Sequence, residues 1–144
     1  MAKKESSELA RLRKQAEDGD PSAQYAIGCR YFEGDGVKQD YDEALRWYRL
    51  AAAQGHNSGL CDVGYCYRNG YGVKKDCCQA IPYYQQAADQ GCPTGAYWLG
   101  VAYQNGQGVK KDLAKARRWF EISVQRGDAD AAEALAELNA AGKK

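Results

Sequence analysis

The chain has 144 residues, of which 27% are charged, and its formal net charge at pH 7 is +1. Such a balance supplies no positive field for a phosphate backbone, and no basic stripe with interleaved aromatic residues occurs, so we expect no nucleic-acid partner. The sequence has no run of about 20 apolar residues, so we do not expect insertion into a membrane.

The sequence repeats itself every 36 residues without a gap. At this period glycine, tyrosine, valine and aspartate fall into fixed columns in three successive segments. The columns are Gly28, Gly64 and Gly100; Tyr31, Tyr67 and Tyr103; Val37, Val73 and Val109; and Asp40, Asp76 and Asp112. A period of this length that occurs three times predicts a solenoid of stacked repeats.

The register divides the chain into five segments. Leu9 and Ala16 fall in the register of Leu45 and Ala52, so the N-terminal segment is predicted to be an unpaired helix that closes one end. The predicted segments are an N-terminal capping helix at 1–19, repeats at 20–55, 56–91 and 92–127, and a C-terminal capping helix at 128–144. We expect them to form a single solenoid domain over residues 5–141.

Each repeat is predicted to be a pair of helices joined by a tight loop. In the first repeat, apolar residues recur at helical spacing over about 22–33 and again after Asp40. Gly34 suits the left-handed residue that follows a helix, and Asp40 suits the N-cap of the next helix. The predicted fold class is therefore all-α: a right-handed α/α solenoid of stacked antiparallel helix pairs with 36-residue repeats.

The glycine column inside the first helices has a structural explanation. A glycine within a helix costs about 1 kcal/mol relative to alanine, so packing is expected to require it. We expect Gly28, Gly64 and Gly100 to lie where two helix backbones approach closely, facing alanines such as Ala44 and Ala80.

These motifs together resemble a known family. The pairs Ile27-Gly28 and Trp47-Tyr48, the loop from Gly34 to Asp40, and the segment from Ala51 to Gly55 match the pattern of the Sel-one-like repeat (SLR) family, a tetratricopeptide-related α/α solenoid family. Ser123 departs from this pattern, because it stands in place of an alanine. The resemblance implies a role in assembling signalling or envelope-related complexes.

A secreted, cysteine-rich branch of this family carries one bridged cysteine pair in each repeat. Here the six cysteines fall at six different register positions, so no repeating bridge is encoded and we expect mostly free thiols. The N-terminal residues lack the apolar stretch of a signal peptide, so the sequence as written indicates a cytoplasmic protein. A trimmed chain of a periplasmic or secreted protein would look the same.

Nothing in the sequence indicates a catalytic, cofactor or metal site. His56 is the only histidine, and it occupies a turn position that usually caps a helix. The cysteines lack the paired spacing of zinc ligands, and the Gly-x-Gly loops end helices, whereas nucleotide-binding loops open them. We therefore predict a protein that is not an enzyme and has no cofactor.

The first helix of each pair is expected to line a concave face, by comparison with the tetratricopeptide architecture. Residues at these positions differ between repeats, so stacking does not dictate them and they are free for recognition. The candidate protein-binding residues are Tyr25, Cys29 and Phe32 in the first repeat, Cys61, Tyr65 and Arg68 in the second, and Tyr97, Val101 and Gln104 in the third.

The predicted function is that of a non-enzymatic adaptor or scaffold that binds a peptide or protein segment in this groove, as a monomer or a weak dimer. Two alternatives stay open. The same fold could serve an inhibitor or immunity-type protein that docks onto an enzyme and blocks it. A hydrolase acting on cell-wall or β-lactam compounds, as proposed for the cysteine-rich branch, is the other.

Overall fold

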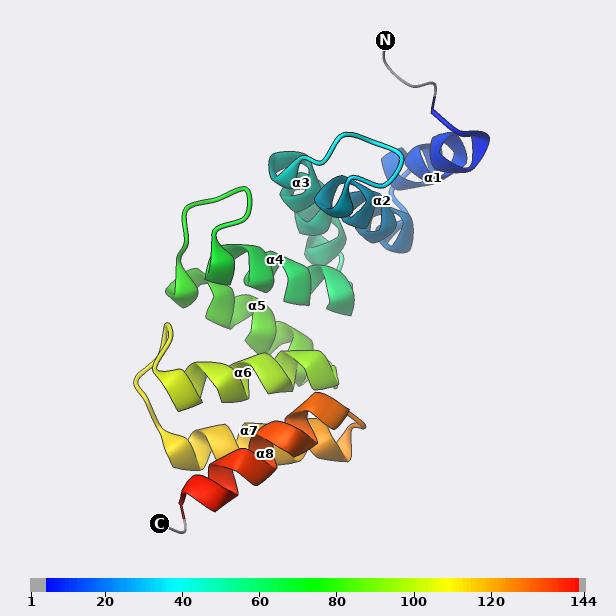
Figure 1. Cartoon of the computed structure of the whole chain (residues 1–144). Helices are drawn as coiled ribbons and strands as arrows, with labels where there is room; N and C mark the ends of the chain where they lie inside the picture. The colour runs from blue at the N-terminus through cyan, green and yellow to red at the C-terminus, as the bar shows by residue number, and fades with distance from the viewer. Residues whose placement is uncertain (1–4, 143–144) are drawn as a thin grey trace. The chain divides into compact units, whose positions relative to one another are not determined.

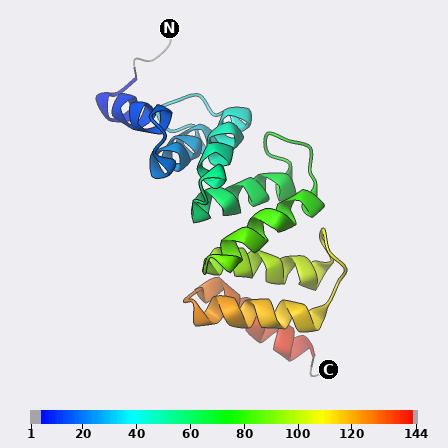
Figure 2. The ribbon, with the colours of Figure 1, turned by 180° about the vertical axis from the view of Figure 1, so that it is seen from behind.

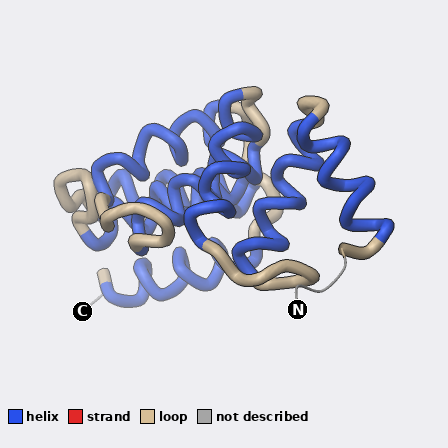
Figure 3. The backbone as a smooth tube through the Cα atoms, turned by 90° about the horizontal axis from the view of Figure 1, so that it is seen from above, coloured by secondary structure: helices blue, strands red, loops and turns tan. Residues whose placement is uncertain are grey.

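The computed structural model describes residues 5–142, which form eight α-helices. Helices and loops alone make up this part of the chain (Figure 3). The predicted all-α class is confirmed. The terminal segments predicted at 1–19 and 128–144 include residues 1–4 and 143–144, which lie outside the described residues. The helices are α1 (Ser7–Glu17), α2 (Pro21–Glu33), α3 (Tyr41–Ala53), α4 (Asn57–Asn69), α5 (Cys77–Asp89), α6 (Pro93–Asn105), α7 (Leu113–Gln125) and α8 (Ala129–Ala141).

The chain divides into two compact units, Met1–Lys75 and Asp76–Lys144. In the first unit, α1 packs on α2, α2 on α3 and α3 on α4 (Figure 1). In the second unit, α5 packs on α6, α6 on α7 and α7 on α8 (Figure 2). Within each unit, every helix therefore buries its apolar stripe against its neighbours in the chain. None of the helices within residues 5–142 is long and apolar enough to cross a bilayer.

The loop inside each repeat is specified by its own residues. Gly34 caps the C-terminus of α2 with φ 73°, in the left-handed region that glycine enters without a steric penalty. Asp40 begins α3 by accepting a hydrogen bond from the Glu43 N–H at 3.1 Å. Both predicted caps are confirmed. The equivalent caps are Gly70 and Asp76 in the second repeat and Gly106 and Asp112 in the third.

The second glycine of the loop lies against the preceding repeat. Gly72 has φ 74°, and a Cβ atom there would lie 2.6 Å from the Tyr41 carbonyl oxygen at the start of α3. Gly108 lies in the same way against the carbonyl of Cys77. A larger residue is excluded both by the backbone conformation and by the lack of space, which explains why the Gly-x-Gly pattern recurs.

The helical glycines lie at close contacts, and the predicted backbone approach is present at Gly28, where a Cβ atom would lie 3.2 Å from the Ala44 carbonyl oxygen. A Cβ atom on Gly28 would lie 2.7 Å from the Tyr48 ring, and one on Gly100 would lie 2.6 Å from the Phe120 ring. The nearest side chain is an aromatic ring of the next helix, which the prediction did not include. The ring can approach the backbone of the first helix only because glycine has no side chain.

A second column of small residues brings two backbones together, and the sequence analysis did not identify it. A Cβ atom on Gly59 would lie 3.1 Å from the Ala52 nitrogen, and one on Gly95 would lie 2.8 Å from the Ala88 nitrogen. These contacts join α3 to α4 and α5 to α6. They set the spacing between successive repeats inside each unit.

The terminal helices contribute to the core of their own unit. Leu9 of α1 packs with Ile27 and Trp47, and Leu138 of α8 packs with Phe120. The departure at Ser123 is accommodated by hydrogen bonds, because its buried hydroxyl donates to the Pro93 carbonyl at 2.8 Å. The unpaired end helices thus complete cores that one helix pair could not bury.

Gly100→Ala tests the contact with Phe120. We expect the variant to lose about 1–3 kcal/mol in the free energy of unfolding, because overpacking outweighs the gain in helix propensity. Urea unfolding followed by circular dichroism measures this. Adding Phe120→Leu to Gly100→Ala should make the glycine substitution less costly than in the wild-type background. An alanine variant as stable as the wild type would contradict the role given to the glycine.

His56 provides a second test. Its Nδ1 caps α4 by accepting from the Gly59 N–H at 3.1 Å, and burial lowers the pKa of His56, opposed by the charge of Asp20. As the pH falls below about 6.5, the unfolded chain takes up a proton at His56 before the folded chain does. The free energy of unfolding should therefore decrease, and then level off below the lowered folded-state pKa.

His56→Asn is the matched control, because asparagine caps helices well and does not titrate. The stability of the wild type relative to this variant should decrease from pH 7.5 to pH 5. His56→Ala should cost about 1 kcal/mol at pH 7.5 through loss of the cap. Parallel pH profiles for the wild type and His56→Asn would show that His56 is not the titrating cap.

Candidate functional site

A cavity of about 190 Å³ lies in the first unit, among helices α2, α3 and α4. Four of the predicted binding residues line it. The lining residues are Tyr25, Cys29, Phe32 and Glu33 of α2, Tyr48 of α3, and Asp62, Tyr65 and Cys66 of α4.

Helical spacing explains why these side chains share one cavity. Tyr25, Cys29 and Phe32 lie four and three residues apart, so they occupy one face of α2. Asp62 and Tyr65 lie three residues apart on α4. The Tyr48 ring, which is 3% exposed, reaches the cavity from α3 through its contact with the helical glycine of α2.

The rings around the cavity form a continuous aromatic cluster. The Tyr48 ring centroid lies 5.6 Å from that of Tyr25 and 6.4 Å from that of Phe32. Tyr71, in the loop after α4, lies 5.2 Å from Phe32 and 5.8 Å from Tyr65. These separations are those of interacting aromatic pairs, so each ring helps to hold its neighbours in place.

The polar groups of the cavity are acidic. The Tyr25 hydroxyl donates a hydrogen bond to the Asp62 carboxylate, and burial raises the pKa of Asp62 although this bond opposes the shift. Glu33 is exposed at the same cavity. No lysine or arginine is among the lining residues, so no basic side chain within the lining balances these two carboxyl groups.

The two thiols at the cavity are not activated for chemistry. The Tyr48 hydroxyl lies 3.5 Å from the Cys29 sulfur as a hydrogen-bond donor, and burial raises the pKa of the Cys29 thiol. Burial also raises the pKa of Cys66 to about 12. A thiol that stays protonated at neutral pH is a poor nucleophile, and the His56 Nδ1 is engaged as a helix cap. The arrangement is suited to binding.

No disulfide bond joins the six cysteines, all of which lie within residues 5–142. Within residues 5–142, no three histidine, cysteine, aspartate or glutamate side chains come together as a metal ion would require.

The structure separates the remaining predicted residues of the first unit from the cavity. Cys61 is only 4% exposed, so it is not available for contact with a partner. Arg68 lies in the last turn of α4, with its guanidinium 3.4 Å from the Asn69 side-chain oxygen. Neither residue lines the cavity that Tyr25 and Tyr65 share.

In the second unit, the predicted residues Tyr97, Val101 and Gln104 all lie on α6 and are partly buried. Tyr97 and Val101 pack against the hydrophobic cluster that contains Phe120, and the Tyr97 ring lies 5.9 Å from the Phe120 ring. These two side chains therefore contribute to the core of their unit as well as to its surface.

The sequence analysis missed Asp62, Glu33, Tyr48 and Cys66 as members of the site. The register did contain a signal for Asp62, because the same position holds Ala26 in the first repeat and Trp98 in the third. Repeat stacking does not require an acid there. Tyr48 gave no such signal, since its aromatic position recurs in every repeat.

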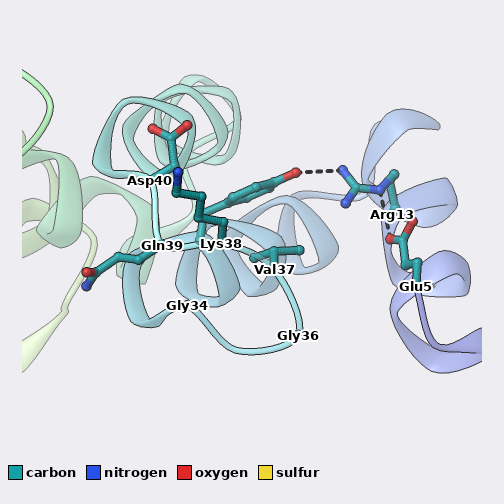
Figure 4. Close-up of a pocket in the computed structure, with 9 residues that line it drawn as sticks. Glu5, Arg13, Gly34, Gly36, Val37, Lys38, Gln39 and Asp40 are labelled. Carbon is teal, nitrogen blue, oxygen red and sulfur yellow. Dashed lines mark hydrogen bonds and ion pairs between the residues drawn. The ribbon is translucent and has the colours of Figure 1, made fainter. Parts of the chain in front are cut away.

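A larger cavity in the first unit, of about 990 Å³, lies at the loop after α2 (Figure 4). Arg13 and Glu5 form an ion pair at 2.9 Å on its edge. A cavity of about 380 Å³ occurs at the equivalent loop of the second unit, beside Tyr103 and Asp112. Because residues of the same repeat columns line both, these cavities are products of the repeated loop, and we do not assign them a specific function.

Comparison with known proteins agrees with this architecture. Three segments, 21–56, 58–92 and 93–128, match the Sel1 repeat. The chain belongs to the Sel1 repeat family. The resemblance inferred from the motifs is therefore confirmed, and proteins of this family generally mediate protein–protein interactions.

Solved structures show the same α/α solenoid. A Sel1 repeat protein from Oxalobacter formigenes is 38% identical, with 90% of this chain and 98% of that one covered and a TM-score of 0.79. The protective antigen c5321 of uropathogenic Escherichia coli, which displays an SLR fold, is 35% identical with a TM-score of 0.86. Cysteine rich protein B of Helicobacter pylori has a TM-score of 0.68 at 24% identity, over 88% of this chain and 91% of that one, and shows the fold alone.

Two of the similar proteins are much longer than this chain. The match to c5321 covers 91% of this chain and 28% of that one. The secretory immunoglobulin A-binding protein EsiB of Escherichia coli is 40% identical over 43 residues, which are 30% of this chain and 9% of EsiB. The chain therefore spans only a small part of each of these relatives.

Asp62→Asn tests the electrostatics of the cavity. The raised pKa of Asp62 means that its contribution to stability is fully present below the ordinary value of 3.8 and is lost as the pH rises through the folded-state pKa. Asparagine keeps an acceptor for Tyr25 and carries no charge. We expect the variant to be more stable than the wild type at pH 7 and equally stable near pH 3.5.

Urea unfolding at both pH values measures this difference. Asp42→Asn, which changes an exposed carboxylate in the same unit, should leave stability nearly unchanged at either pH. A loss of stability in Asp62→Asn at pH 7 would show that the charge stabilises the fold, contrary to the burial argument.

Proposed function

We propose that this Sel1 repeat protein is a non-enzymatic adaptor or scaffold, and that its first unit binds a partner polypeptide at the cavity between α2 and α4. The observation that carries the proposal is the cluster of partly exposed aromatic residues around this cavity. Phe32 and Tyr65 stand at register positions that hold other residue types in the other repeats, whereas Tyr25 recurs as Tyr97 in the third. Stacking within the solenoid therefore does not explain Phe32 and Tyr65.

The size and lining of the cavity favour a polypeptide partner. A volume of about 190 Å³ is below the roughly 300–1,000 Å³ of pockets for small molecules and cofactors, and it suits a single side chain. Tyrosine residues are among those that most often anchor protein interfaces. The name of EsiB describes binding to secretory immunoglobulin A, which supports a protein partner for related repeats.

The second unit contributes contacts of its own under this proposal. Tyr97, Val101 and Gln104 stand on α6 at the register positions that in the first unit supply Tyr25, Cys29 and Phe32. We propose that their partly exposed atoms contact the same class of partner, with Gln104 as the polar contact.

Tyr65 and Tyr67 form a matched pair for a test, because they lie on the same helix, are both partly buried and belong to different faces. Tyr65 lines the cavity, whereas the Tyr67 hydroxyl accepts a hydrogen bond from Arg49 at 2.7 Å. Tyr65→Ser should weaken partner binding at least tenfold, which corresponds to about 1.4 kcal/mol. Tyr67→Ser should leave binding nearly unchanged.

The measurement is affinity capture from a lysate of the organism that makes the protein, quantified by mass spectrometry for the wild type and both variants. Circular dichroism melting verifies that each variant is folded at the capture temperature. Equal capture by the wild type and Tyr65→Ser would place binding outside the cavity and contradict the proposal.

A further inference from the structure

The cavity of the first unit is specific enough to indicate what part of a partner it receives. Building on the proposed function, we infer that it binds one arginine side chain of the partner, with the guanidinium paired to the Asp62 carboxylate and lying among the Tyr25, Phe32 and Tyr65 rings. The general role of the family in protein interaction does not identify arginine as the side chain that is bound.

The acidic groups that line the cavity are not balanced by a basic lining residue. Asp62 and Glu33 are the two ionisable carboxyl groups of the cavity, and no lysine or arginine lines it. The nearby basic side chains are engaged elsewhere. Arg30 pairs with Asp35 at 3.1 Å, and Arg49 donates to the Tyr67 hydroxyl at 2.7 Å. Within the described residues 5–142, Asp62 therefore has a hydroxyl partner in Tyr25 and no cationic one.

The walls of the cavity are largely aromatic, because Tyr25, Phe32 and Tyr65 line it. A cation close to the face of a tyrosine or phenylalanine ring is attracted by the ring's quadrupole, most strongly where water is excluded. The guanidinium is planar and weakly hydrated, stacks on aromatic rings, and pairs with a carboxylate through two parallel hydrogen bonds. The compact, strongly hydrated ammonium of lysine makes poorer use of the same surroundings. An acidic cavity with aromatic walls thus matches arginine.

The volume of the cavity favours the end of a single side chain as its occupant. At about 30 Å³ for each water molecule, a cavity of about 190 Å³ corresponds to roughly six waters. This is space for the end of one long side chain. It is too small for a helix or for a second ring system in addition to the rings already present.

Packing of the repeats does not require the carboxyl group of Asp62. Ala26 and Trp98 occupy its position in the other repeats, so an acid is not needed for stacking. Burial raises the pKa of Asp62, which means that its charged form is disfavoured in the unbound protein. A destabilised charge in a cavity is a common property of binding sites, because the ligand supplies the missing partner.

The test is a titration of the full isotope-labelled chain with N-acetyl-L-arginine amide, followed by two-dimensional NMR up to the solubility of the probe. We expect saturable shifts at the backbone amides of Tyr25, Cys29, Asp62 and Tyr65. N-acetyl-L-citrulline amide has the same shape without the charge, so its affinity should be at least tenfold lower. The lysine analogue should also bind more weakly than the arginine probe.

Asp62→Asn should reduce the affinity for the arginine probe at least tenfold, and Asp42→Asn should leave it unchanged. Three results would each overturn the inference: no saturable shift at the cavity, equal binding of the citrulline or lysine probe, or undiminished binding by Asp62→Asn. The spectrum of each variant shows directly whether it is folded.

The result is distinguishable from the outcome of the partner-capture experiment. If Tyr65→Ser loses the partner but the arginine probe does not bind, the proposed function stands and the arginine assignment fails. If the probe binds at the cavity and partner capture does not depend on Tyr65, the arginine site stands and the proposed use of the cavity for partner binding fails.

Discussion

The close approach of neighbouring helix backbones is the contact on which the rest of the structure depends. A single helix cannot bury its apolar stripe, so each one needs the surface of the next. Gly59 and Gly95 allow the backbones of successive repeats to come together, and Gly28 and Gly100 admit an aromatic ring from the partner helix. The cost in helix propensity, about 1 kcal/mol for each glycine, is offset by the packing that the missing side chain permits.

This packing also creates the candidate site. The Tyr48 ring lies against Gly28, and from there its hydroxyl reaches the cavity that the first helices line. The candidate site therefore stands on helices whose spacing is fixed by the core, so its rings are held in place by packing. Asp62 differs from these rings, because burial disfavours its charged form. Under the proposed function, the requirements of stability and of partner binding are opposed at Asp62.

The sequence by itself determined the helix caps and the shared face of α2, because both depend on a short segment of the chain. Gly34 and Asp40 specify the end of α2 and the start of α3 through contacts within a few residues, so both caps could be predicted. Helical spacing similarly brought Tyr25, Cys29 and Phe32 to one face of α2. Membership of the Sel1 repeat family was predicted from the residues that recur every 36 positions. Such predictions succeed because their causes are local and recur three times in the chain.

Only the tertiary structure decided which side chains from different helices meet. Cys61 and Tyr65 lie four residues apart on α4, yet the first is buried and the second lines the cavity. The hydrogen bond from Tyr25 to Asp62 joins α2 to α4, and no period in the sequence could indicate it. The physical reason is that burial, pKa and cavity shape depend on distances between segments, whereas the repeat pattern records only what each segment requires for stacking.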